Sequence, residues 1–147
     1  YVILWDMKRR NLSHLKLTIF LILLAGGTVH AVLEYLYRGR SHRSMLLDPG
    51  LCTVLIRLLH EWDGGTALVP QLLLGACVIT ESELLFGAIF NRTCAVWDYR
   101  GLRHNYRGQI CPQFFCCWLF VALLAVFLDD GVRYVSFGEA LPRYTLF

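Results

Sequence analysis

The stretch ALVPQLLLGACVITESELLFGAIF, from Ala67 to Phe90, decides the fold of this chain. It is longer than the ~20 apolar residues that an α-helix needs to cross the ~30 Å hydrocarbon core of a bilayer. Glu81 and Glu83 lie inside it. A carboxylate at that depth is costly unless a partner or a water-filled cavity compensates for its charge. Both residues are therefore candidates for a functional site.

Composition supports a membrane protein built around this stretch. Of the 147 residues, 56% are hydrophobic and 17% are charged, against about 45–50% and about 25% in a soluble domain. We therefore predict one all-α, polytopic membrane domain over residues 1–147, with three to four transmembrane helices. The predicted spans are residues 17–37, 46–61, 66–90 and 113–131.

The second of these segments is the least regular. Residues 39–50 have the composition of a polar loop, and Asp48-Pro49-Gly50 at its end is a strong turn signal. The apolar run that follows is short and contains Arg57. The segment is predicted to be either a tilted span or a re-entrant half-helix, which is tolerated only where protein or water covers its backbone.

Basic residues gather between the apolar segments. This is typical of juxtamembrane anchors that meet lipid headgroups, so we expect a lipid bilayer as partner and no nucleic acid. The clusters are Lys8-Arg9-Arg10, then Arg38, Arg40 and Arg43, then Arg92, Arg100, Arg103 and Arg107.

Motifs for catalysis and cofactors are missing from the sequence. It contains no G-x-x-x-x-G-K-[ST] phosphate loop, so ATP-driven transport would need a separate ATPase subunit. Its six cysteines include no C-x-x-C pair, and no His follows them at zinc-ligand spacing. We expect no enzyme activity, no cofactor and no metal site.

One face of the 66–90 helix carries a polar stripe. Glu83, Gly87 and Asn91 follow one another at i, i+4 spacing and so share a face, while Glu81 is rotated away from it. The stripe could line a path for a cation or a polar ligand. Alternatively it is structural, with Glu83 paired to Arg57, Gly87 allowing close approach and Asn91 capping the helix.

The first span holds a second such pair. His30 and Glu34 are also four residues apart, and His titrates near neutral pH. A proton relay and a simple hydrogen bond both fit this spacing. Gly26-Gly27 in the same span favours close helix packing over a gate.

The loop after the third span concentrates polar and aromatic residues. It could bind a lipid headgroup or dock a partner protein, or it could be a plain interfacial anchor. The candidates for docking are Trp97, Asp98, Tyr99, Asn105 and Arg107.

Several motifs together resemble one family, from about Gly26 to the C-terminal tail. They are Gly26-Gly27 through Glu34, Arg38-Gly39-Arg40, Ser41-His42, Ser44-Met45, Ile79-Thr80, Glu83, Gly87, Asn91, Val96-Trp97-Asp98-Tyr99, Asn105, Gly108-Gln109-Ile110-Cys111, Trp118, Asp129-Asp130, Arg133-Tyr134, Phe137-Gly138-Glu139, Pro142 and Tyr144. The pattern is similar to the small bacterial membrane proteins of the putative ABC-transporter permease family (CmpB type). The chain departs from that pattern at Asp48-Pro49-Gly50, Arg57 and Arg100.

The resemblance implies a permease component that moves a small solute or ion across the bacterial cytoplasmic membrane as a multi-pass protein. Glu34, His30, Glu81, Glu83, Asn91 and Arg57 are the candidates for the transport path. At this length a lone copy is thin for a pathway, so we expect a homo-oligomer. The alternative is a membrane-embedded scaffold or regulatory subunit that does not transport.

Overall fold

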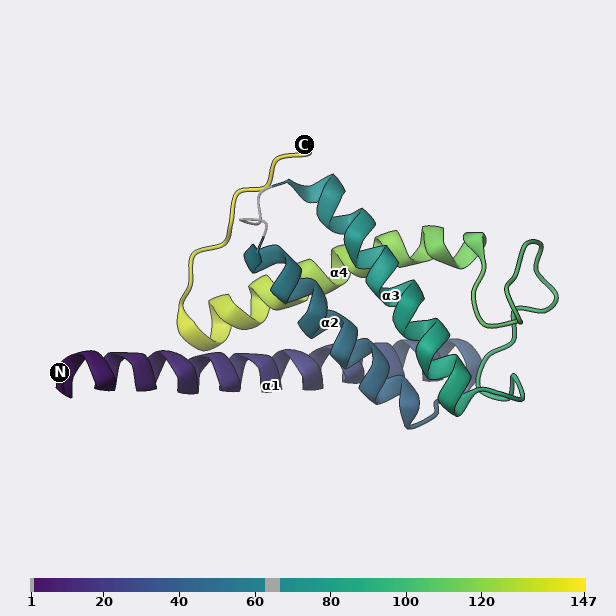
Figure 1. The fold of residues 1–147 in the computed structure, drawn as a ribbon, viewed down its shortest axis with the longest axis horizontal. Coiled ribbons are helices and arrows are strands. Elements are labelled where there is room, and N and C mark those ends of the chain that lie inside the picture. The colour runs from purple at the N-terminus through teal and green to yellow at the C-terminus, as the bar shows by residue number, and fades with distance from the viewer. Residues whose placement is uncertain (1, 63–66) are drawn as a thin grey trace.

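The chain folds into four helices. The computed structural model describes the backbone of residues 2–62 and 67–147, and the side chains of residues 13–60 and 67–147. The helices are α1 (Val2–Arg38), α2 (Ser44–Trp62), α3 (Leu68–Phe90) and α4 (Pro112–Phe137), with no β-strand in the described ranges (Figure 1). This confirms the predicted all-α class.

Three of the helices can cross a bilayer. Ser13–Arg38, Leu68–Phe90 and Pro112–Phe137 are long and apolar enough to do so. The chain is thus a multi-pass membrane protein. The last helix is longer than expected, because it does not end near Asp129-Asp130 but continues to Phe137, where Gly138 closes it in the left-handed conformation (φ 67°).

The shortest helix is the most central one. α2 packs against α1, α3 and α4, whereas the backbones of α1 and α3 do not approach each other in the described part of the chain. Its polar side chains Asp48, Thr53 and Arg57 are buried. At 19 residues it is about 28 Å long at 1.5 Å per residue. Its charges are tolerated because the other helices, and not lipid, surround them.

The predicted turn at Asp48-Pro49-Gly50 is wrong. These residues lie inside α2, which begins at Ser44. The backbone N–H of Ser44 donates to His42 Nδ1 at 3.2 Å, and that of Met45 donates to the His42 carbonyl at 2.8 Å. His42 therefore supplies two acceptors for the first N–H groups of the helix, which would otherwise lack partners.

Glycines allow α1 and α2 to approach at backbone distance. A Cβ on Gly27 would overlap the Leu46 carbonyl oxygen, and one on Gly50 would overlap the Leu23 carbonyl oxygen. A Cβ on Gly26 would lie 2.9 Å from Thr53 Cβ. The Gly26-Gly27 pair is thus a packing contact, as expected, and the approach it allows buries the polar face of α2.

We expect Gly27→Ala to destabilise the protein, because the methyl group would meet backbone that cannot move aside. Overpacking of this kind costs about 1–3 kcal/mol. Gly131→Ala is the matched control, since it lies in α4 with nothing within 4 Å of its added Cβ. Alanine favours a helix over glycine by about 1 kcal/mol. Thermal unfolding in detergent should show a lower midpoint for Gly27→Ala than for the wild type and no decrease for Gly131→Ala. Equal midpoints for the two variants would contradict the packing role.

The C-terminal tail caps the start of α3, beside which it runs in Figure 1. The N–H of Leu68 donates to the Thr145 carbonyl at 2.8 Å, and that of Val69 donates to the Leu146 carbonyl at 3.1 Å. Pro70 has no N–H to satisfy. The tail thus replaces the side-chain cap that Ala67 cannot provide.

Candidate functional site

Glu83 is held by two neutral donors. Tyr99 donates its hydroxyl to Oε1 at 2.6 Å, and Trp118 donates its indole N–H to Oε2 at 3.1 Å. Burial and the neighbouring carboxylate raise the pKa of Tyr99 above its ordinary value, which keeps its hydroxyl a proton donor. Glu83 therefore ties α3 to the loop and to α4.

Arg57 does not pair with Glu83, contrary to the structural alternative. Its Nη1 lies 2.8 Å from Asp129 Oδ1, and each side chain is only 6% exposed. Arg133 approaches the other Asp129 oxygen at 3.7 Å. Arg57 therefore ties α2 to α4, which holds Asp129 buried near its C-terminal end.

Asp48 is a buried carboxylate that sequence reasoning missed. The turn prediction placed it in a loop, but in α2 it accepts hydrogen bonds from Ser82 on α3 and from Cys52 Sγ, the latter at 3.7 Å. Ser82 and Glu83 are neighbours on α3, so Asp48 and Glu83 lie at similar depth. The i, i+4 spacing of Asp48 and Cys52 was the available signal.

A half-open cavity of about 350 Å³ lies between the four helices and is lined by these two carboxylates. Its polar wall consists of His30 from α1, Asp48 and Thr53 from α2, Glu83 from α3 and Trp118 from α4. The remaining lining is almost entirely apolar. Ligand pockets commonly have about 300–1,000 Å³ and this mixture of apolar surface with a few polar groups.

His30 and Glu34 are not hydrogen-bonded to each other in the described part of the chain. His30 faces the cavity, whereas Glu34 accepts hydrogen bonds from Ser41 at 2.7 Å and from Arg38 at 3.4 Å. Although His30 and Glu34 lie one helical turn apart on α1, they contact different parts of the protein. The structure thus brings together His30 and Glu83 at the cavity and leaves Glu34 at the end of α1.

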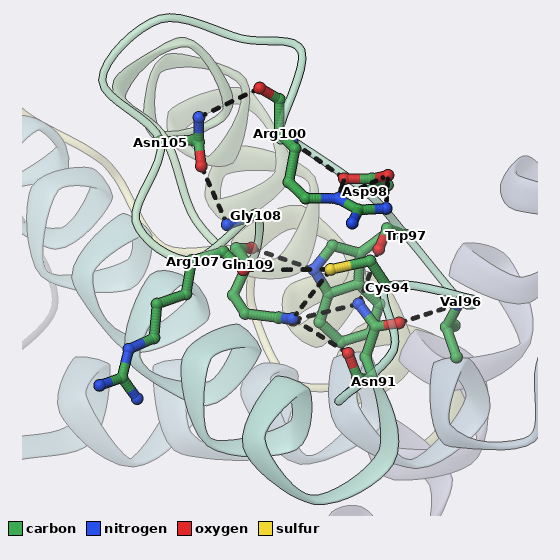
Figure 2. Close-up of polar contacts among 10 residues, drawn as sticks. All are labelled: Asn91, Cys94, Val96, Trp97, Asp98, Arg100, Asn105, Arg107, Gly108 and Gln109. Carbon is green, nitrogen blue, oxygen red and sulfur yellow. Dashed lines mark hydrogen bonds and ion pairs between the residues drawn. The ribbon is translucent and has the colours of Figure 1, made fainter.

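Asn91 organises the loop that follows α3. It is fully buried, and its amide donates to the Trp97 carbonyl at 2.7 Å and to Gln109 Oε1 at 3.1 Å. Its own Oδ1 accepts the Val96 N–H at 2.8 Å. Figure 2 shows these contacts, which hold the two sides of the loop, at Val96-Trp97 and at Gln109, against the end of α3.

Trp97 and Tyr99 are buried in this arrangement instead of facing a partner. Each is 4% exposed, and the Trp97 indole N–H donates to the Gln109 carbonyl at 3.0 Å (Figure 2). Gly87 leaves room for Gln109 and Trp97, since a Cβ at Gly87 would lie 2.9 Å from Gln109 Cδ and 3.2 Å from Trp97 Cζ2. Gln109 is a structural residue that no periodicity in the sequence indicated.

The loop tip carries the remaining candidates. Arg107 is exposed and Asn105 is half-buried; Asn105 donates to the Leu102 carbonyl at 2.8 Å and accepts the Gly108 N–H at 2.9 Å. Asp98 pairs with Arg100 at 2.7 Å on the surface. Hydrogen bonds from Arg100 lower the pKa of Asp98 to about 2.

Glu81 faces away from the site. It lies exposed on the outer side of α3, among the exposed side chains of Cys77, Leu74, Leu85 and Ala88. With 3.6 residues per turn these five share one face. Glu81, a candidate for the transport path, therefore lies outside the cavity, on the face of α3 that its spacing from Glu83 predicts.

Comparison with known proteins identifies one family. The model of a family described as putative ABC-transporter type IV matches residues 49–135, which is more than half of the chain. The match runs from α2 through most of α4 and includes the whole loop, but leaves out α1. No curated protein and no solved structure matches the chain.

Proposed function

Since this chain belongs to the putative ABC-transporter type IV family, we propose that it is a permease subunit that moves a small solute or ion across the bacterial cytoplasmic membrane. The observation that carries the proposal is the cavity between the helices. It joins apolar walls to the carboxylates of Asp48 and Glu83, and ionisable groups inside membrane segments mark substrate paths in transporters.

The proposal assigns no catalytic step to this chain. The sequence has no phosphate-binding loop, so energy from ATP would come from a separate ATPase subunit. The loop tip, with exposed Arg103, His104 and Arg107, is available for docking that subunit. The hydrogen bonds of Asn91 hold the base of this loop against the end of α3.

Purification of the tagged protein from its native membrane in mild detergent tests the proposal. We expect a nucleotide-binding subunit in fixed stoichiometry, identified by mass spectrometry, and ATP hydrolysis by the complex. Arg107→Glu should weaken its retention, while Arg92→Glu, exposed at the end of α3, should not. A homo-oligomer without any nucleotide-binding subunit would instead support the scaffold alternative.

The outer face of α3 is the proposed contact between two copies of the permease. Glu81 lies two residues from the middle of α3, about 3 Å along the axis. A charged residue near the bilayer centre costs about 2.5–3.5 kcal/mol on insertion scales. In a two-fold contact both copies present the same face, so two Glu81 carboxyl groups would meet and could share a proton.

Cys77 offers a direct prediction for this contact, because it lies one turn from Glu81 on the same face. We expect mild oxidation in native membranes to cross-link a variant that keeps Cys77 as its only exposed thiol. A variant that keeps only Cys116, exposed on α4, is the control and should stay monomeric on non-reducing gels. Glu81→Lys should abolish the Cys77 cross-link by placing two cations in the contact; equal cross-linking from both cysteines would contradict this interface.

A further inference from the structure

The charge in the cavity points to the class of ligand. Its lining holds two carboxylates, Asp48 and Glu83, each 6% exposed, and no Lys or Arg among the lining residues that the structure describes. His30 and Cys52 are the other titratable side chains among these lining residues. The arginine of α2, Arg57, is paired with Asp129 at 2.8 Å. The two carboxylates thus have neutral hydrogen-bond donors but no guanidinium or ammonium partner in the cavity wall.

Such an arrangement favours a positive occupant. A buried carboxylate is costly in apolar surroundings unless an opposite charge lies nearby. A concave site whose charges have one sign also concentrates the field in its interior. A ligand cation between Asp48 and Glu83 would supply the missing compensation.

The remaining walls favour an apolar body on that cation. The cavity is lined by aliphatic side chains from every helix and by the aromatic rings of Trp118 and Phe127. A strongly hydrated inorganic ion would lose its hydration shell on entering the cavity without gaining enough ligands, since Mg²⁺ and Ca²⁺ prefer six or more oxygens. An alkylammonium or quaternary ammonium compound would instead bury its apolar part, and its charge could approach the indole face.

We propose that the cavity binds a monovalent organic cation with an apolar body, held between Asp48 and Glu83. This substrate class rests on the proposed permease function, because it takes the same cavity as the transport site. Equilibrium binding, however, requires neither transport nor an ATPase. Loss of the nucleotide-binding partner would therefore overturn the permease proposal and leave this one standing.

Benzyltrimethylammonium is the probe, and neopentylbenzene is its neutral isostere, in which carbon replaces the charged nitrogen. We expect saturable binding of labelled benzyltrimethylammonium to the purified full chain in lipid nanodiscs, with one site per chain. Neopentylbenzene should compete at least tenfold more weakly. The proposal is overturned if the cation shows no saturable binding or if the neutral isostere competes equally, since an apolar pocket alone would then explain the cavity.

Two variants locate the site. Glu83→Gln and Asp48→Asn should each weaken binding at least tenfold, because each removes one of the two charges. Glu81→Gln removes a carboxylate from the same helix but from its outer face, so it should bind the probe like the wild type. Equal losses for Glu81→Gln and Glu83→Gln would place the effect on the overall charge and overturn the proposal. The comparison of cation and isostere on the wild-type chain decides the matter even if a variant fails to fold.

Discussion

Arg57→Met is expected to lower the free energy of unfolding by about 3–5 kcal/mol, the usual cost of removing one partner of a buried ion pair. The loss arises because Asp129 would keep its charge inside the helix bundle. The other cation near Asp129 is Arg133, whose Nη1 lies 3.7 Å from its carboxylate, against 2.8 Å for Arg57. Thermal and denaturant unfolding in detergent would measure the change.

The double variant Arg57→Met/Asp129→Leu tests whether the lost stability comes from the unpaired charge of Asp129. Replacing both members of a buried pair by apolar residues is often neutral or stabilising, so the double variant should regain most of the lost stability. Arg100→Met is the control, because its pair with Asp98 is exposed and should leave the unfolding midpoint unchanged. If the single and double variants lost the same stability, the ion pair would not be the cause.

Asn91→Ala is expected to lower the free energy of unfolding by about 3 kcal/mol, since a buried group left without its partner costs about 1–3 kcal/mol. The substitution strands the Val96 N–H, the Trp97 carbonyl and Gln109 Oε1, all of which Asn91 satisfies. The effect should be local. Hydrogen exchange should accelerate at the Val96 and Tyr99 amides and stay slow at the centre of α4.

The adjacent Arg92→Ala provides the control for Asn91. Arg92 is exposed, and among the described residues its side chain donates only to the Ala88 carbonyl of α3, so its loss should change neither stability nor exchange in the loop. Fast exchange throughout the protein in Asn91→Ala would show that the loop is not an independent unit. An unchanged loop would contradict the organising role of Asn91.

The sequence predicted which residues form the polar stripe on α3, but not which residues contact that stripe. Helical periodicity alone put Glu83, Gly87 and Asn91 on one side and Glu81 on another, and the structure has both arrangements. The residues that meet the stripe lie far along the chain: Tyr99, Gln109 and Trp118. Spacing within a helix carries no information on such contacts, because they depend on how the loop folds back.

The second helix shows where local signals failed. Asp48-Pro49-Gly50 is a turn by local preference, yet packing of Gly50 against the Leu23 carbonyl and of Asp48 against Ser82 places it inside α2. The energy of burying this segment among three helices outweighs the local preference. Because the sequence prediction put Asp48 in a loop, it also missed Asp48 as a buried carboxylate.

The sequence by itself determined the membrane class and the helical fold. Each follows from the length and apolarity of a segment, because lipid cannot satisfy backbone polar groups and so permits only helices in a chain of this pattern. Only the tertiary structure decided which charges meet. Glu83 lines the cavity with Asp48, and Arg57 pairs with Asp129. The reason is that charge pairing in an apolar medium depends on distances between helices, and these are set by close contacts such as Gly27 on Leu46.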